Sequence, residues 1–218
     1  MARPALTIAQ VDAFRDRATE KALELFVSEG YAHFSLRTLA KALGCSHTTP
    51  YRYFPGGKAE IFAAVRAGGF RRFAAALRRS QEGPGGPEER LRSMARAYFD
   101  FADQQPAAFA VIFQMGEPAG ELEPEVFDDV VDAARDAWSV VLSCVGHAIE
   151  AGTVCGEVDE VAHTMWAGMH GVACLESART LAMGRAAPQV LESMVEALLR
   201  AHRPIQPSQI QPSQEGGA

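Results

Sequence analysis

Prolines stand at the start of helical patterns in the second half of this 218-residue chain. Pro87, Pro106, Pro124 and Pro188 each precede residues whose apolar side chains recur every three or four positions. Proline fits the first turn of a helix, because the amide hydrogen that it lacks has no partner there. No stretch shows the apolar–polar alternation of a half-buried strand. The sequence therefore predicts an all-α protein.

Glycine and serine mark the helix ends in the first half. Apolar residues at helical spacing from Val11 to Phe26 predict a first helix, which Gly30 ends. Ser35 can cap the start of a second helix, and Ser46 the start of a third. The further helices that we expect cover residues 36–43, 47–54, 58–80, 87–104, 106–114, 124–151, 158–183 and 188–202.

Charge is distributed unevenly along the chain. Residues 1–80 contain 13 Lys and Arg against 6 Asp and Glu, whereas residues 81–218 contain 8 against 21. The loop Gly83–Pro87 lies near the boundary. The excess of basic residues in residues 1–80, in a chain that is otherwise acidic, suggests that the N-terminal part binds a polyanion. The acidic run over residues 117–136 is interpreted as a solvated loop and helix start.

Membrane and secreted proteins are disfavoured. The longest charge-free run, Val161–Leu175, is shorter than the roughly 20 apolar residues of a membrane span. The first residues carry charge where a signal peptide would be apolar, so we expect a cytoplasmic protein.

The cysteines are widely spaced and are expected to be reduced, small buried hydrophobes: Cys45, Cys144, Cys155 and Cys174.

Residues 36–54, LRTLAKALGCSHTTPYRYF, have the form of a helix-turn-helix: two short helices in a basic region, joined by a tight turn that contains Gly44. The first helix would bury Leu36, Leu39, Ala40 and Leu43. The second would present His47, Thr48 and Thr49 to a major groove, where hydroxyl groups can bond base edges. Tyr51 and Tyr53 lie further along, where a phenol can bond a phosphate.

Residues 22–65 resemble the N-terminal domain of the TetR family of bacterial transcriptional regulators. The features that carry the resemblance are the aromatic residue and glycine after the first helix, LRTLAKALG, the serine cap, YRYF and FPGGK. The resemblance covers about residues 8–70. Cys45 stands where the family usually has Val, and Pro50 where it has Leu or Ile. Pro50 removes a backbone donor, but the helix is expected to survive.

The resemblance implies a homodimer that binds a pseudo-palindromic operator in double-stranded DNA. It also implies a C-terminal helical domain in which a small-molecule effector changes the spacing of the two reading helices. By position in the motif, the implied DNA-binding residues are Arg37, Ser46, His47, Thr48, Thr49, Tyr51, Tyr53 and Lys58. The implied domains are 1–70 for DNA binding and 71–203 for effector binding and dimerisation. The repeated IQPSQ pentapeptide predicts a disordered tail over 204–218.

The C-terminal half resembles the family less. Residues 166–171 match a W-x-x-x-H-G pattern of one subgroup of effector domains, and the dimer-interface candidates are Trp166, His170 and Gly171. An effector pocket could be lined by Phe99, Phe109, Phe113, Trp138 and His170, with Phe101 as a further aromatic candidate. Each of these aromatic residues is as readily explained as plain core.

The sequence contains no recognisable nucleophile–base–acid set, so we expect no enzyme and no cofactor. His147, His163 and His170 lack the spacing of a helical zinc site, so no metal is expected either. The predicted function is a dimeric, sequence-specific transcriptional regulator, a repressor released by an effector. The alternative is a helical-bundle ligand carrier or enzyme whose helical hairpin is only structural.

Overall fold

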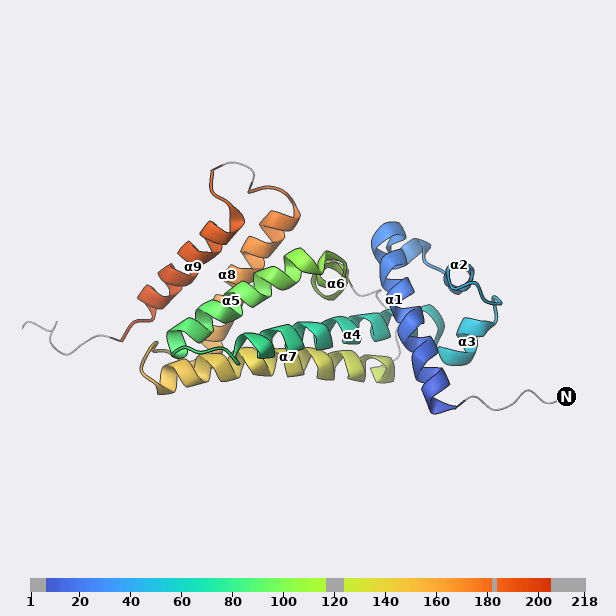
Figure 1. Cartoon of the computed structure of the whole chain (residues 1–218), viewed down its shortest axis with the longest axis horizontal. Coiled ribbons are helices and arrows are strands. Elements are labelled where there is room, and N and C mark those ends of the chain that lie inside the picture. The colour runs from blue at the N-terminus through green and yellow to red at the C-terminus, as the bar shows by residue number, and fades with distance from the viewer. Residues whose placement is uncertain (1–6, 117–123, 182–183, 205–218) are drawn as a thin grey trace, which may run out of the picture. The chain divides into compact units, whose positions relative to one another are not determined.

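Thr7 begins the first helix of the computed structural model. Its side chain accepts a hydrogen bond from the backbone of Gln10, and its own backbone N–H donates to the Gln10 side chain. The structure describes residues 7–116, 124–181 and 184–204, which form helices and no strand, so the all-α prediction is confirmed. In chain order (Figure 1), the elements are α1 (Ile8–His33), α2 (Leu36–Ala42), α3 (Thr49–Tyr53), α4 (Gly57–Ser80), α5 (Pro87–Gln104), α6 (Pro106–Phe109), the π-helical turn η1 (Ala110–Gln114), α7 (Pro124–Glu150), α8 (Val158–Ser177) and α9 (Ala187–Ala201).

The proline-marked boundaries are confirmed. α5, α6 and α7 begin at Pro87, Pro106 and Pro124, and α9 begins one residue before Pro188. Gly30 also ends regular helix: its φ of 79° interrupts α1, and the amide of Phe34 then donates back to its carbonyl.

The helix predicted over residues 158–183 is too long, since α8 ends at Ser177. Arg179 adopts the left-handed conformation with φ 54°. Its amide donates to Glu176, and the amide of Thr180 donates to Leu175, which together form a Schellman cap. Glycine usually occupies this position, so the sequence carries no signal for the stop. Residues 182–183 lie outside the described part.

The single helix predicted over residues 106–114 changes type part-way. After α6, the amide of Met115 donates to the carbonyl of Ala110, five residues earlier, which closes the π-helical turn η1. Ile112 of this turn packs against Gly69 of α4, where an added Cβ would lie 2.6 Å from the Ile112 Cγ2. Gly69 therefore allows η1 to approach α4.

The chain divides into two compact units. One comprises residues 1–80 and 97–140, and the other residues 81–96 and 141–218, so α5 and α7 contribute to both. These are packing units and do not test the boundary predicted at residue 70, which lies within α4. Of the predicted tail, residues 205–218 lie outside the described part. None of the described helices is long and apolar enough to cross a membrane.

Two apolar clusters are found among the described residues of the first unit. The larger lies beneath α1, α2, α3 and α4 and includes Phe26, Leu39, Phe54, Ile61 and Phe62. The smaller joins α4 to α7, which lie side by side (Figure 1), through Ala63, Ala67, Val130 and Ala133.

Two ion pairs flank the contact between α4 and α7. Arg71 pairs with Asp129, and Arg78 pairs with Asp136, one pair two helical turns beyond the other. The side chains remain about half exposed, so each pair contributes little to stability. Part of the acidic run is thus solvated, as interpreted from the sequence, and also faces arginines of α4.

In the second unit, α8 packs against α9. Gly168 permits the approach, because a Cβ there would lie 2.6 Å from the Met194 sulfur. Arg92 of α5 binds Glu196 of α9 at 2.7 Å and Glu88 at 2.8 Å. The hydrogen bonds from Arg92 and Arg200 lower the pKa of the Glu196 carboxyl.

Candidate nucleic-acid interface

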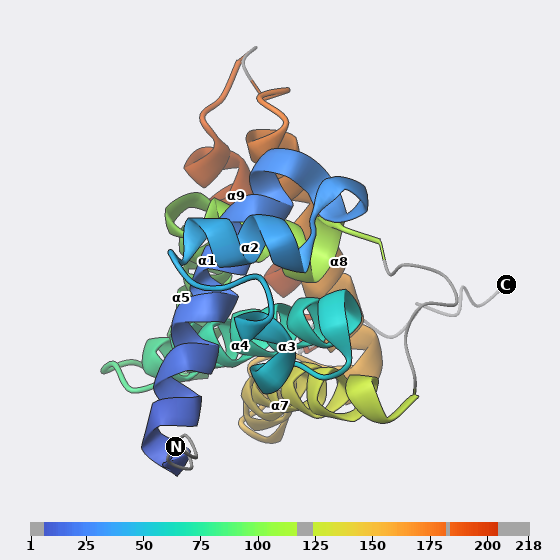
Figure 2. The same cartoon turned by 90° about the vertical axis from the view of Figure 1, so that its right-hand side faces the viewer.

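The first half of the helix-turn-helix forms as the sequence predicts. The Ser35 hydroxyl accepts a hydrogen bond of 3.0 Å from the Thr38 amide and so caps α2. Leu36, Leu39 and Ala40 are buried as predicted, whereas Leu43 is only half-buried and packs at the edge of the same cluster. Gly44 has the left-handed φ of 65° that the turn requires. The buried side chains of α2 therefore anchor the start of the turn between α2 and α3 to the apolar core. In Figure 2, α2 and α3 face the viewer, with this turn between them.

The second half begins later than predicted. α3 starts at Thr49 and not at His47, and Ser46 is not its cap. A helix capped by Ser46 would need the amide of residue 50 to donate to the Ser46 carbonyl, and Pro50 has no amide hydrogen. The Thr49 amide donates to that carbonyl instead, at 2.8 Å, and forms a turn. Pro50 thus shortens the reading helix to five residues.

One face of this segment is open to solvent. His47, Thr48, Tyr51 and Arg52 are exposed, whereas Pro50 is buried. Thr49 is half-buried, so Thr48 is the more accessible of the two threonines. The Ser46 and Thr48 hydroxyls lie 3.1 Å apart, also exposed. Arg52 is not among the residues predicted from sequence. It lies four residues after Thr48, a spacing that places two residues on the same face of a helix and could have identified it.

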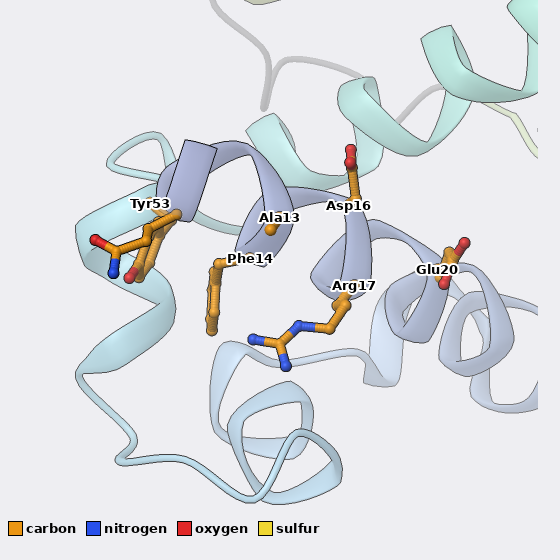
Figure 3. A pocket seen from close by; sticks show the side chains of 7 residues that line it. Ala13, Phe14, Asp16, Arg17, Glu20 and Tyr53 are labelled. Carbon is orange, nitrogen blue, oxygen red and sulfur yellow. The ribbon is translucent and has the colours of Figure 1, made fainter. Parts of the chain in front are cut away.

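Tyr53 lies against α1. Its ring stacks on Phe14 with centroids 3.9 Å apart and an interplanar angle of 22°. Figure 3 shows the two rings beside each other. They border an open hollow of about 700 Å³. The hollow is lined by Gln10, Ala13, Phe14, Asp16, Arg17, Glu20 and Tyr53.

Arg37 lines a second open hollow, of about 530 Å³, together with Thr38, Ala40, Lys41, Cys45 and His47. Arg37 and Lys41 are both exposed on α2. Lys41 is absent from the sequence predictions, although its position four residues after Arg37 places both on one helix face. Two cations here favour an anionic partner such as a phosphate.

Lys58 lies near the start of α4 and is held by the end of α1. Its ammonium lies 4.0 Å from the centroid of the Tyr31 ring and 3.4 Å from the Ala32 carbonyl oxygen. An ammonium has three donors, so these contacts leave capacity for a phosphate. The side chain is nevertheless more constrained than a freely solvated lysine.

The effector-pocket candidates are only partly brought together. Phe109 and Phe113 lie with ring centroids 5.2 Å apart. Phe101 joins the same group of rings, together with Phe73 and Tyr98, which the sequence predictions omit. The remaining candidates are Phe99 on α5, Trp138 on α7 and His170 on α8, and all three are half-buried.

The dimer-interface candidates share α8. Trp166 and His170 are in ring contact at 5.8 Å, and the Cys174 sulfur lies 3.3 Å from His170 Nε2. Both His170 and Cys174 are half-buried, and burial lowers the pKa of His170. At Gly171, an added Cβ would meet nothing within 4 Å.

The cysteines differ in burial. Cys144 is buried, which raises the pKa of its thiol to about 11. Cys155 is exposed, so the prediction that it is a buried hydrophobe is wrong: it lies in the connection after α7, where its backbone pairs with His202. All four are free thiols.

Two histidines of the second unit bond to their own helices. His147 and His163 each contact the carbonyl four residues earlier. Within residues 7–116, 124–181 and 184–204, no group of three His, Cys, Asp or Glu is placed to hold a metal ion.

Comparisons with solved structures give the same fold. A protein of unknown function from Rhodococcus sp. RHA1 is 25% identical, with a TM-score of 0.75 over 87% of this chain and 95% of that one. A tetR-family regulatory protein from Rhodococcus RHA1 is 20% identical, with a TM-score of 0.71 over 88% and 98%. The TetR-family transcriptional regulator PfmR from Thermus thermophilus is 23% identical, with a TM-score of 0.67 over 85% and 98%. No curated protein is significantly similar in sequence.

Two family models match the sequence itself. The model for bacterial regulatory proteins of the tetR family matches residues 18–65, which include α2, α3 and the start of α4. The model for the tetracyclin repressor-like C-terminal domain matches residues 91–198. The chain therefore belongs to the TetR family, as a DNA-binding transcriptional regulator with a ligand-binding C-terminal domain.

Proposed function

We propose that this regulator is a homodimer that reads a pseudo-palindromic operator with α3 and represses transcription until a small apolar effector releases it. The observation that carries the proposal is the exposed face formed by His47 and Thr48, in the turn before α3, and by Tyr51 and Arg52, on α3, in the basic part of the chain. Hydroxyl, imidazole and guanidinium groups can bond base edges in the major groove.

Cations beside this face supply the phosphate contacts. Arg37 and Lys41 lie on α2, and Lys58 lies at the start of α4. Phosphate contacts fix the register of the protein on the duplex, while base contacts select the sequence. We assign Thr48 and Arg52 to reading, and Arg37, Lys41 and Lys58 to the backbone.

The dimer would form through α8, with Trp166, His170 and Gly171 at the interface. Small or apolar residues follow one another on an accessible side of this helix: Thr164, Ala167, Gly171 and Leu175. Leu175 is 45% exposed, although it is a large apolar residue. A second copy of α8 would bury this face, and a two-fold dimer matches a two-fold operator.

The effector would be apolar. The rings of Phe73, Tyr98, Phe101, Phe109 and Phe113 form a largely buried aromatic group, and no polar or charged residue is buried in the described part of the chain. A charged ligand would lose its hydration there without gaining an oppositely charged partner. Regulators of this family are generally not enzymes, and the proposed activity is binding without catalysis.

Selection from a pool of random duplexes tests the DNA-binding part. Wild-type protein should enrich one two-fold symmetric site, with half-sites about one helical turn or a multiple apart. A parallel selection with Thr48→Ala should enrich a site that differs at one or two positions of each half. A carrier or enzyme with a merely structural hairpin would enrich nothing, and a DNA-packaging protein would bind every duplex without preference.

Transcription in vitro tests the direction of control. A promoter that contains the enriched site should be silenced by the protein, and an apolar effector should restore transcription. Increased transcription on addition of protein alone would make the regulator an activator.

A further inference from the structure

Arg15 of α1 makes three contacts at and just beyond the C-terminal end of α3. Its guanidinium donates to the carbonyl of Tyr53, the last residue of α3. It lies 4.3 Å from the centroid of the buried Phe54 ring. It also donates to Glu60 of α4 at 2.9 Å. One half-buried side chain thus joins α1, the end of α3 and the first turns of α4.

Glu60 extends this connection to the turn between α3 and α4. One of its carboxylate oxygens accepts from Arg15, and the other accepts from the Gly56 amide at 2.9 Å. The side chains of Arg15 and Glu60 are only 35% and 21% exposed. Their charge-assisted hydrogen bonds are therefore less screened than those of a surface pair.

The reading helix needs such external support. α3 has only five residues. Its N-cap residue, Thr48, makes no capping hydrogen bond with its side chain, and Pro50 has no amide hydrogen to donate to the backbone. A helix this short is unstable by itself. Consecutive residues of α1, Phe14 and Arg15, hold consecutive residues at the end of α3, since Phe14 stacks on Tyr53 and Arg15 covers Phe54. The stack on Phe14 is visible in Figure 3.

We infer that Arg15 and Glu60 are positioning residues for DNA reading: they set the direction in which α3 presents Thr48 and Arg52. This inference rests on the proposed function. Arg15 acts through Tyr53 and Glu60, and not through a phosphate. Misdirection of α3 should weaken binding to the selected site and leave binding to random duplex almost unchanged.

The test is Arg15→Met, which keeps a long apolar stem but removes the donors. The measured quantity is the ratio of affinities for the enriched site and for a scrambled duplex. This ratio does not depend on the fraction of folded protein, so a merely structural role would leave it unchanged. We expect the ratio to fall about tenfold or more, with an unaltered salt slope on random duplex.

Arg17→Met is the matched control, because it removes the same charge from an exposed position two residues along α1. Its ratio should stay within about twofold of wild type. A fall of the Arg17→Met ratio equal to that of Arg15→Met would overturn the inference. So would an Arg15→Met variant that weakens both duplexes equally with a salt slope shallower by about one, since Arg15 would then be a phosphate contact.

Glu60→Gln provides a second variant if Arg15→Met does not fold. In Glu60, one carboxylate oxygen accepts from Arg15 and the other from Gly56; glutamine replaces one of these oxygens by a donor NH2 group and removes the charge, so the two hydrogen bonds cannot both be kept as they are. Its ratio should fall about threefold or more, and an unchanged ratio in folded Glu60→Gln contradicts the inference. If wild type itself prefers no duplex, the proposed function has failed, which this experiment distinguishes from failure of the positioning role.

Discussion

At the scale of the residue, Pro50 changes where α3 begins and which side chains near its start are exposed. It prevents a helix from starting at His47, yet its buried ring anchors α3 to the core. The first helical residue becomes Thr49, which is half-buried, and the accessible hydroxyl moves to Thr48. Because its side chain is the more exposed of the two, we expect Thr48 to contribute more than Thr49 to the proposed base reading.

Thr48 and Lys58 should respond differently to substitution. Thr48→Ala should lower affinity for the selected site by about 1–3 kcal/mol and change the preference at one or two base pairs. Thr49→Ala should have a smaller effect on preference. Lys58→Met should weaken all duplexes by a similar factor, with a salt slope shallower by about one. Fluorescence anisotropy over a salt series measures both quantities, and circular dichroism checks the helices. A change of base preference in Lys58→Met would disprove this assignment.

His170 should make folding sensitive to mild acid. Burial lowers its pKa below the ordinary value of 6.5, so the unfolded chain binds the proton more readily. The stability that depends on neutral His170 is complete above pH 6.5 and is lost as the pH falls from there towards the lower pKa of the folded state. Urea unfolding at several pH values should show a shallower decline for His170→Gln than for wild type. Parallel declines would show that His170 does not contribute.

At the scale of the element, adjacent glycines in α4 have opposite roles. At Gly68, the nearest side-chain atom to an added Cβ is the Arg72 Nη1 at 3.9 Å. At Gly69, the Ile112 Cγ2 of η1 lies only 2.6 Å away. From the sequence alone the two residues are equivalent, since each glycine is about 1 kcal/mol less favourable in a helix than alanine. Only the packing of η1 distinguishes them.

This difference predicts stability changes of opposite sign. Gly68→Ala should stabilise the protein by about 0.5–1 kcal/mol, because alanine is the better helix former. Gly69→Ala should destabilise it, because the β-branched side chain of Ile112 cannot rotate away. Chemical denaturation measures both variants, and Gly69→Ala should cost less stability in an Ile112→Ala background than in the wild-type chain, since the clashing Cγ2 is then absent. A stabilising Gly69→Ala would show that η1 moves freely on α4.

Several helix boundaries could be predicted from sequence because a residue at the boundary marks them. Prolines mark the starts of α5, α6 and α7, and Ser35 caps α2. Features that depend on residues distant in sequence could not be predicted. The π-helical turn packs on Gly69, about 40 residues earlier. The hydrogen bond to the Tyr53 carbonyl comes from Arg15, in α1.

At the scale of the whole molecule, dimerisation determines whether two reading helices can act on one operator. Gly171→Arg should abolish the dimer without unfolding the chain, because a Cβ at this position meets nothing within 4 Å. Gly146→Arg, in α7, is the matched control, since its Cβ position is equally open. Sedimentation should give a monomer for Gly171→Arg and a dimer for wild type and Gly146→Arg. A wild-type protein that stays monomeric with and without DNA would contradict the proposed assembly.

The central claim is that the basic N-terminal part of this acidic chain reads DNA sequence. The most direct measurement is the affinity of the wild-type protein for its enriched duplex and for a scrambled duplex of equal composition, by fluorescence anisotropy at several salt concentrations. The enriched duplex should bind about a thousandfold more tightly or better, and both affinities should fall steeply between about 50 and 200 mM salt. Equal affinities for the two duplexes, or binding that does not change with salt, would contradict the account.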